Sequence, residues 1–596
     1  MFTSVPKGER MSVNPLHTTL GRVDTDYAYA VVSDMAKSLT RVWAGSPQEQ
    51  VAADYIAKEL AKWGLEVRFH ELYGHVSHPG SGRLEVLTHG APLELTCNVM
   101  AQTEPADGFE AAVVYAGNGG FADYESLDVT GKVVVVDLSY SPPRPEKMRI
   151  AKLHGAAGMI MINWGDARNP SIPYGTTKYV WGNPTRDQAE DMITLPGVAI
   201  TRPDGDRLLA LLKDQPDLRV RITAQVERKW RRLLLPYVWV GEGESSDREF
   251  VLVAGHYDNW GGGATDNLSG DAALVALARH FHSVRDQLKR DVLVAWWPAH
   301  ESGIMIGSTW FADRHWRLLR DRAVAYVNID QLGMGDYSRW YVEASAELRS
   351  LIVDAGVPET TAWDRPHKYG DQSFFGVGLP STNCFTGTTE EEKAANNGMT
   401  LGFWYHSDQD TIDKLNPKTY AEGIERNAEY ISRIVGTDLL PYGMADVARE
   451  IQNRLTAIGE ALNGWDADGA GYGWTPTVRE AADLLEAALA FDAAAQTPLS
   501  AEDIRAANAA IKRVSRLTIP VRMAAADRYG QDTYGQSRLV NVLPELQVLV
   551  DRAALQPEDE TAHFMDAEIH RALNRLSDAL VEAAETLRAA TREITA

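Results

Sequence analysis

Residues 249–256 read EFVLVAGH, and three related segments follow them in the chain. They are GDAALVALARHF at 270–281, DVLVAWWP at 291–298 and AVAYVNID at 323–330. The first, third and fourth segments are nearly continuous apolar runs, typical of strands buried on both faces, whereas the second has helical spacing. Strands that alternate with crossover helices form a mainly parallel sheet covered by helices on both faces. We therefore predict an α/β domain.

The segments on either side have a different pattern of apolar residues. Apolar residues at helical spacing from Val51 to Trp63 precede an alternating strand pattern from Leu65 to Phe69. Between about 98 and 232, short β-rich runs such as GKVVVVDLS and GMIMINW are separated by Gly, Pro and Asp, which indicates an inserted domain. Residues from about 444 are rich in Ala and Leu and are predicted to be helical. The predicted domains are 1–97 together with 233–443, the insert 98–232 and the helical region 444–596.

The composition restricts the classes of partner. The 82 acidic residues outnumber the 59 basic ones and give a net charge of −23, which argues against nucleic acid or an anionic membrane as a partner. The two cysteines, Cys97 and Cys384, exclude a disulfide framework and a zinc site made of four thiolates. The first residues lack the apolar run of a signal peptide, and no later stretch has the roughly 18 apolar residues of a membrane span. We expect a soluble, cytoplasmic protein.

Five side chains suited to metal binding lie at or just beyond the ends of apolar segments. They are His256, Asp266, Glu301, Asp330 and His406. In an open α/β sheet, ligands bind at the carboxyl ends of the strands, so these positions can converge on one crevice. Taken singly, each Asp is more often a turn residue and each His more often a core or surface residue. The complete set favours a shared site.

Two histidines and three carboxylates suit a pair of divalent ions with one carboxylate shared between them. Zinc is the metal that this mixture of ligands favours, so we expect two Zn²⁺ ions per chain. A two-metal site activates water and polarises the carbonyl group that the water attacks. The ligand set therefore indicates a metal-dependent hydrolase.

The motifs around these residues resemble those of the aminopeptidase-type co-catalytic zinc peptidases. In the order of that family, the chain contains HYD (256–258), GATDNLSG (263–270), HESG (300–303), NID (328–330), GDQSFFGVGLPS (370–381) and YHSDQDT (405–411). The resemblance covers nearly the whole chain and is closest to the branch that contains glutamate carboxypeptidase and the transferrin receptor. It implies that the insert is a protease-associated domain and that the C-terminal helices form a dimerisation domain. We therefore expect a homodimer or a higher even-numbered assembly.

The resemblance also implies a role for each ligand. Asp266 would bridge the two ions. His256 and Asp330 would complete one half-site, and Glu301 and His406 would complete the other.

Three neighbours of the ligands are assigned by the same resemblance. Asp258 matches the carboxylate that orients a ligand imidazole, and Asp410 is expected to serve His406 in the same way. Tyr405 resembles the hydroxyl donor that stabilises the tetrahedral oxyanion, although packing of its ring is an equal alternative. Asp258 and Tyr405 are therefore candidate catalytic residues.

His300 departs from the family pattern. The family has Glu-Glu where this chain has His300-Glu301, and the first Glu is its proton shuttle. Three interpretations stay open: His300 is the general acid/base of an amide hydrolase, the site is a lyase or cyclase for a small non-peptide C–N substrate, or the chain is a catalytically silent, metal-stabilised scaffold. We favour the hydrolase, acting on a short peptide or a small amide, because a silent site has no need for all five ligands.

Other segments bear on the substrate and on assembly. The polar stretch TGTTEEEKAANNGMT (386–400) is predicted to be an active-site flap or an oligomer contact. Arg339 and Arg365 are candidates to bind a substrate carboxylate. Apolar residues from Ile569 to Leu587 have heptad-like spacing, for which packing within the chain is favoured and a dimer contact is the alternative.

Overall fold

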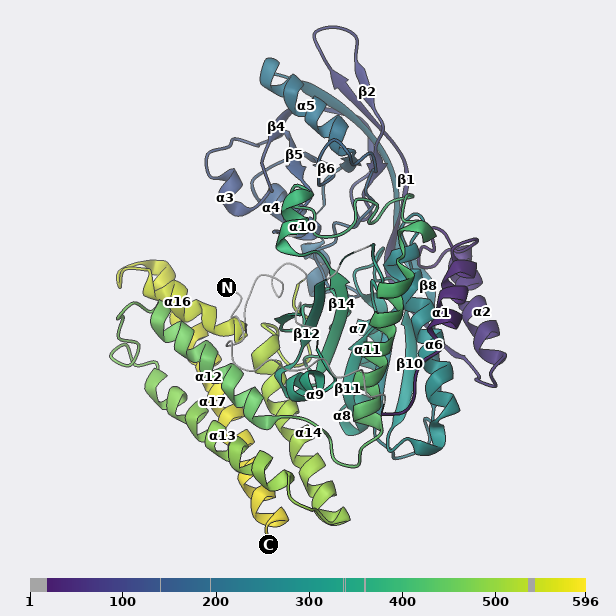
Figure 1. Ribbon diagram of the computed structural model, residues 1–596. Coiled ribbons are helices and arrows are strands. Elements are labelled where there is room, and N and C mark those ends of the chain that lie inside the picture. Colours follow the sequence, from purple (N-terminus) through teal and green to yellow (C-terminus); the bar gives the residue numbers. More distant parts are fainter. Residues whose placement is uncertain are drawn as a thin grey trace.

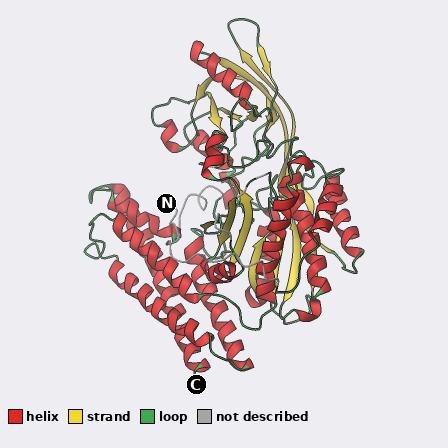
Figure 2. Ribbon diagram, in the orientation of Figure 1, coloured by secondary structure: helices red, strands yellow, loops and turns green. Residues whose placement is uncertain are grey.

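The computed structural model describes residues 19–139, 141–192, 194–335, 337, 339–357, 361–533 and 542–596. These residues form a central α/β region, a β-rich region at one end and a bundle of helices at the other (Figure 1). The strands are concentrated in the first two regions, and the third is built from helices (Figure 2). The N-terminal residues 1–18, which belong to the first predicted domain, lie outside the described residues.

The centre of the sheet is parallel. Strand β9 (Phe250–His256) pairs in parallel with β10 (Asp291–Trp297) and with β11 (Ala323–Asn328), and β11 pairs in parallel with β14 (Ser381–Gly387). Strand β12 (Arg339–Ala344) is antiparallel to β14, and β13 (Ala362–Asp364) follows at the edge. The sheet is therefore mixed around the parallel centre that the apolar runs predicted.

Helices cover both faces of this sheet because successive residues of its strands point to opposite sides. Val251 and Val253 pack in the cluster that contains α1 (Thr25–Met35), α2 (Pro47–Ala61), α6 (Ser269–Ser283) and α11 (Pro417–Val435). Phe250 and Leu252 pack in the cluster that contains α7 (Ile306–Arg314) and α8 (Trp316–Arg322). The short helix α9 (Arg349–Asp354) follows β12.

A long antiparallel ribbon joins the α/β region to the β-rich region. It consists of β1 (Arg68–Leu87) and β8 (Arg219–Val240), and the small strand β2 (Leu93–Leu95) pairs with β1. Because β8 pairs with β10 at one end and with β4 (Ala106–Tyr115) at the other, the described strands form one 14-stranded sheet. The sequence predicted only the start of β1, since Pro79 and three glycines interrupt its pattern. The ribbon absorbs them with a bulge between Pro79 and Gly82.

The β-rich region contains the two short runs noted in the sequence, as β5 (Val133–Asp137) and β6 (Gly158–Ile162). Strands β4, β5, β6 and β7 (Gly197–Ile200) are parallel, and β3 (Asn98–Val99) is antiparallel to β7. The helices of this region are α3 (Phe121–Tyr124), α4 (Arg144–Leu153) and α5 (Arg202–Asp214). The predicted boundaries 98 and 232 stay predictions, since β8 runs through the second of them.

The C-terminal region is helical, as predicted. It comprises α12 (Met444–Ala461), α13 (Trp474–Ala495), α14 (Ala501–Met523), α16 (Gln547–Ala553) and α17 (Glu560–Ile594). Ile569, Leu573, Leu576, Leu580 and Leu587 of α17 are each at most 2% exposed and pack in the core of the chain. The heptad-like seam is therefore packing within the chain, and its alternative as a dimer contact is wrong because these five side chains are already covered.

A buried ion pair connects the helical region to the α/β region, and we expect its loss to be costly. Arg522 of α14 has no exposed side-chain surface and pairs with Glu347, which follows β12, and with Glu450 of α12, its Nη1 lying 2.7 Å from Oε2 of Glu450. Arg522→Met should lower the free energy of unfolding by about 3–5 kcal/mol, because it leaves two buried carboxylates without a counterion. Denaturant unfolding measures this change.

Arg513→Met is the matched control, since Arg513 lies on the same helix and pairs with Glu582 in an exposed position. It should lower the free energy of unfolding by less than about 1 kcal/mol. Equal losses for the two variants would show that burial of the Arg522 pair adds nothing.

Within the described ranges, none of the helices combines the length and the apolar character needed to cross a membrane.

Candidate metal centre

The five predicted ligands meet at the carboxyl ends of the parallel strands. His256 is the last residue of β9, and Glu301 and Asp330 lie in the loops after β10 and β11. Asp266 lies in the turn that joins β9 to α6, and His406 lies in the loop before α11. All five are buried, with at most 6% of their surface exposed.

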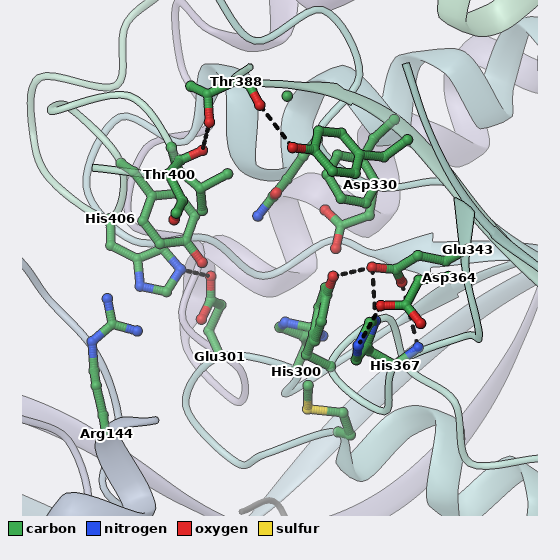
Figure 3. Close-up of a pocket in the computed structure, with 18 of the residues that line it drawn as sticks. Arg144, His300, Glu301, Asp330, Glu343, Asp364, His367, Thr388, Thr400 and His406 are labelled. Carbon is green, nitrogen blue, oxygen red and sulfur yellow. Dashed lines mark hydrogen bonds and ion pairs between the residues drawn. The ribbon is translucent and has the colours of Figure 1, made fainter. Parts of the chain in front are cut away.

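Asp266 occupies the middle of the set. Its Oδ1 lies 3.1 Å from Nε2 of His256, and its Oδ2 lies 3.2 Å from Nε2 of His406. His256 Nε2 is also 3.4 Å from Oδ1 of Asp330, and His406 Nε2 is 2.9 Å from Oε1 of Glu301, a contact drawn in Figure 3. The side chains therefore form two groups of three that share Asp266.

The inward-facing atoms of these groups have the character of metal ligands. His256 Nε2, Asp266 Oδ1, Glu301 Oε1 and Asp330 Oδ1 are buried and have no hydrogen-bond partner in the described part of the chain. Buried polar atoms without partners are costly, and divalent cations satisfy imidazole nitrogens and carboxylate oxygens together. The residues therefore fit a pair of ions that share Asp266.

Hydrogen bonds fix the orientation of two ligands. His256 donates from Nδ1 to the backbone carbonyl of Asp258 at 2.9 Å, which leaves its Nε2 for an ion. The indole Nε1 of Trp260 donates to Oε2 of Glu301 at 2.8 Å, which leaves Oε1 for the second group. The indole of Trp260 therefore orients a ligand.

Asp258 acts on the loop that carries Glu301. Its carboxylate accepts the backbone N–H groups of His300 and Glu301 at 2.9 and 3.1 Å. The predicted contact with the ligand imidazole is made by its backbone carbonyl, and its Oδ1 lies 3.8 Å from Nδ1 of His256. Burial raises the pKa of Asp258 to about 6, despite these donors and the nearby histidines.

Asp410 supports Asp266, and the predicted contact with His406 is wrong. Its carboxylate accepts the backbone N–H of Thr265 at 2.9 Å and that of Asp266 at 3.1 Å, and burial raises its pKa to about 7. The loop after His406 packs on the glycine-rich turn before Asp266, where a Cβ on Gly262 would lie 2.2 Å from the carbonyl oxygen of Asp410. Gly262 therefore permits this close approach of the two loops.

Tyr405 packs on a ligand and lines the cavity in front of the ligand groups. Its ring is stacked on the imidazole of His406, with the ring centroids 3.9 Å apart and an interplanar angle of 19°. The packing alternative is therefore observed. The role of its hydroxyl as an oxyanion donor stays a prediction.

His300 lies beside the ligands and is held by a carboxylate that the sequence did not reveal. Its ring is stacked on that of His256, with centroids 3.9 Å apart, and it donates from Nδ1 to Oδ2 of Asp371 at 2.7 Å. The other oxygen of Asp371 accepts the hydroxyl of Ser308 at 2.7 Å. Burial and the neighbouring His256 would by themselves lower the pKa of His300. The Asp371 carboxylate outweighs both, so the net effect is a raised pKa. Nε2 of His300 remains available to the cavity.

Asp371 could be found in the sequence only as part of the motif GDQSFFGVGLPS, which gave no indication of its partner. Its side chain is buried, and its backbone has a φ of 52°, in the left-handed region that Asp tolerates better than most residues. Backbone conformations of this kind are enriched at functional sites.

The β-rich region holds the loops that carry the ligands. Lys178 donates from Nζ to the carbonyl of Gly303 at 2.7 Å, and the side-chain amide of Gln102 donates to the carbonyl of Ser302 at 3.2 Å. The backbone N–H of Tyr174 donates to the carbonyl of His406 at 2.7 Å. The insert therefore forms part of the site.

A cavity of about 310 Å³ opens on the ligand groups. Its lining includes His300, Glu301, Asp330 and His406 from the α/β region, and Arg144 from the β-rich region (Figure 3). Arg144, at the start of α4, is 6% exposed, and its guanidinium carbon lies 6.0 Å from the centroid of the Tyr405 ring. The sequence proposed Arg339 and Arg365 instead, and neither is among the described residues that line the cavity. Arg144 could not be identified from the sequence because it lies far from the ligands along the chain.

The segment 386–400 forms one wall of this cavity. It contains the short helix α10 (Glu390–Ala395), and Thr388, Glu390 and Lys393 line the cavity. Asn397 donates from Nδ2 to the carbonyl of Gly165 at 2.7 Å, which ties the segment to the β-rich region. This placement favours the interpretation as a flap over the site.

Two family models match the chain in the regions described above. Residues 238–431 match peptidase family M28, and residues 108–208 match the PA domain. The chain carries an M28 peptidase domain. This finding confirms the resemblance indicated by the motifs, and with it the protease-associated insert.

Individual relatives of the M28 domain agree with this assignment. A probable glutamate carboxypeptidase from Arabidopsis thaliana is 24% identical over 384 residues, which cover 54% of this chain and 54% of that protein. An aminopeptidase from Bacillus subtilis is 22% identical over 411 residues, which cover 65% of this chain and 80% of that protein. The chain therefore spans about half the length of the first relative and four fifths of the second.

A solved structure confirms the fold. The structure of a zinc aminopeptidase from Bacillus subtilis superposes with a TM-score of 0.53 at 20% identity, and the match covers 69% of this chain and 95% of that one. Together with the PA-domain match and the helices α12 to α17, this superposition shows that the predicted fold class is correct.

Proposed function

We propose that this protein is a two-zinc hydrolase that cleaves an amide bond in a short peptide or an amino-acid-derived amide, with His300 as the general acid/base. The observation that carries the proposal is the pair of buried ligand groups that share Asp266, with the imidazole of His300 beside them. The structurally similar protein from Bacillus subtilis is a zinc aminopeptidase, which supports zinc as the metal.

The arrangement suggests how the chain's own residues divide the work. Bound to the shared ligand groups, two divalent ions supply the activation of water and the polarisation of the amide carbonyl. His300 keeps a proton on Nδ1 for Asp371, so its Nε2 can take a proton from the attacking water and deliver it to the leaving amine. Asp371 is then a positioning residue, which fixes the orientation and the tautomer of the imidazole. The hydroxyl of Tyr405 is proposed to donate to the oxyanion.

Arg144 supports a substrate that carries a free carboxylate near the scissile bond. A planar guanidinium binds a carboxylate through two parallel hydrogen bonds, and Arg144 lies in the cavity wall on the side of His406 and Glu301 (Figure 3). Gly175 leaves the space for it, since a Cβ there would lie 2.8 Å from Cδ of Arg144. A cavity of about 310 Å³ suits a substrate of the size of a dipeptide better than a long chain.

Arg144→Ala should therefore raise the KM for a dipeptide by about 10–100-fold and change kcat much less, because hydrogen bonds to a charged group contribute about 1.5–3 kcal/mol. Steady-state kinetics measure the effect. The same dipeptide with an amidated C-terminus should respond little to the substitution. Arg149→Ala, on the same helix but outside the cavity lining, is the control. An equal rise in KM for the free and the amidated peptide would contradict the proposed role.

The hydrolase itself is tested by turnover of a panel followed by mass spectrometry. The panel contains aminoacyl amides, dipeptides and N-substituted amino acids, offered to zinc-replete protein. Addition of water across an amide bond is the expected result. Products whose masses add up to that of the substrate, without an added water, would indicate a lyase or cyclase. No turnover of any compound would favour the silent scaffold.

Assembly into a homodimer or a higher even-numbered oligomer and a cytoplasmic location stay predictions from the sequence.

A further inference from the structure

The cavity extends away from Arg144 to a second end with a different character. Figure 3 places Arg144 on one side of Glu301 and His300, and Glu343, Asp364 and His367 on the other side. A substrate held by its carboxylate at Arg144 would therefore direct its remaining portion toward this second end.

Aromatic side chains form much of the wall there. The described residues that line this end include Tyr341, Trp363, Tyr369 and Phe385. The rings of Tyr341 and Phe385 are stacked, with centroids 5.5 Å apart and an interplanar angle of 11°. Faces of aromatic rings attract cations as well as apolar groups.

Glu343 is a buried carboxylate in the same wall, only 3% exposed. It accepts Nδ1–H of His367 at 3.0 Å and the side-chain amide of Asn383 at 3.2 Å, and it is bonded to the hydroxyl of Tyr369. Burial alone would raise the pKa of Glu343. The interactions with His367 and the other hydrogen-bond donors outweigh burial, so the pKa is lowered. Glu343 is therefore ionised near neutral pH.

Two further carboxylates make this end negative. Asp364 lies 3.4 Å from Nε2 of His367, and Glu390 lines the cavity from the flap. Lys393 is the positive side chain in this part of the described lining, and His367 adds at most one further positive charge. The three carboxylates of the lining outnumber both. Arg365 is buried outside the lining and also attracts Asp364 and Glu343, so the excess of negative charge belongs to the groups that face the cavity. Arg339 packs over the Tyr341 ring at 5.2 Å but is not among the described residues that line the cavity.

We propose that this end of the cavity is a subsite for a cationic group on the substrate, a protonated amine or a guanidinium, held between the aromatic rings and the carboxylates. The inference rests on the proposed function, because it concerns the portion of an amide substrate opposite the carboxylate bound by Arg144. It makes the preferred substrate a short peptide with a basic N-terminal portion and a free C-terminal carboxylate. Two sources supply such a cation, the α-amine and a basic side chain.

Matched dipeptides test the subsite. Lys, norleucine and Glu at the first position, with the same second residue, compare side chains of related length that carry a positive, a neutral and a negative charge. Lysine should exceed norleucine in kcat/KM by about tenfold, in the range of a cation–π contact with added charge attraction, and glutamate should be lowest. The Nα-acetylated lysine peptide separates the two sources of the cation. If the side chain is bound, acetylation leaves the preference of lysine over norleucine in place. If the α-amine is bound, lysine and norleucine peptides have similar kcat/KM, and acetylation lowers kcat/KM for both.

Substitutions test which residues cause the preference for lysine. Asp364→Asn and Glu390→Gln should each reduce the preference for lysine over norleucine by about 2–5-fold, because partly exposed charges contribute modestly. Glu391→Gln is the matched control, since Glu391 is the next residue on α10 but does not line the cavity. Raising the salt concentration should weaken the preference in the wild type.

Binding measurements separate this inference from the proposed function. The same peptides are titrated calorimetrically into the zinc-replete His300→Ala protein, in which turnover should be slow. Tighter binding of the lysine peptide without hydrolysis by the wild type would overturn the hydrolase and keep the subsite. Hydrolysis by the wild type would keep the hydrolase, and the subsite would be overturned if lysine then bound no tighter than norleucine and Nα-acetylation weakened the binding of neither peptide.

Discussion

The Asp266→Asn protein is expected to hold neither zinc ion and to lose all measurable hydrolysis. Asp266 directs one oxygen to each ligand group, at 3.1 Å from His256 Nε2 and 3.2 Å from His406 Nε2. An amide has a single oxygen acceptor and no charge, so it cannot complete both groups. Loss of the ions removes both the activated water and the polarised carbonyl.

Elemental analysis of the purified protein after dialysis against a zinc buffer measures the prediction. The wild type should contain close to two zinc ions per chain. Asp408→Asn should keep both, since Asp408 lies in the same loop as His406 but its exposed carboxylate pairs with Arg41. One ion retained by Asp266→Asn would show that the two groups do not depend on a shared ligand. A fully loaded wild type with one ion would make the two-metal assignment wrong.

The sequence predicted the α/β region well because local pattern and global fold agree there. The segments at 250–256, 291–297 and 323–328 are nearly continuous apolar runs, and each is a strand buried on both faces. The order of the strands and the rule that ligands gather at their carboxyl ends then bring His256, Glu301 and Asp330 together. In the structure these three residues lie together.

The parts that sequence reasoning missed depend on contacts between distant segments. Asp371 meets His300 across 71 positions in the sequence, and Arg144 reaches the cavity from another region. No local spacing predicts such contacts. Asp410 lies four residues after His406, which suggested a contact with that ligand, but the loop turns its carboxylate to the backbone of Asp266. Spacing along a loop says little about direction, whereas spacing along a strand or helix says much.

The His300→Ala protein should keep both zinc ions and lose about 10²–10⁴-fold in kcat, the usual contribution of a general acid/base. Binding of substrate should change much less, because His300 contributes a proton path, and the ligand groups are complete without it. Steady-state kinetics and elemental analysis on the same preparation measure both effects. Wild-type turnover in this variant would show that His300 carries no catalytic proton. Loss of one ion would make His300 a ligand, since its imidazole also lies near His256 and Glu301.

Two further substitutions separate a proton shuttle from a structural residue and decide the reaction class. Asp371→Asn keeps the size of the side chain but changes its charge and its hydrogen bonding to His300, so kcat should fall while KM and zinc content stay near wild type. It should also move the pH dependence of kcat/KM, which a purely structural role would leave in place. His300→Glu restores the residue that the family carries. A hydrolase should retain or regain amide cleavage in that variant, whereas a site adapted to lyase or cyclase chemistry should lose its native reaction with both ions still bound.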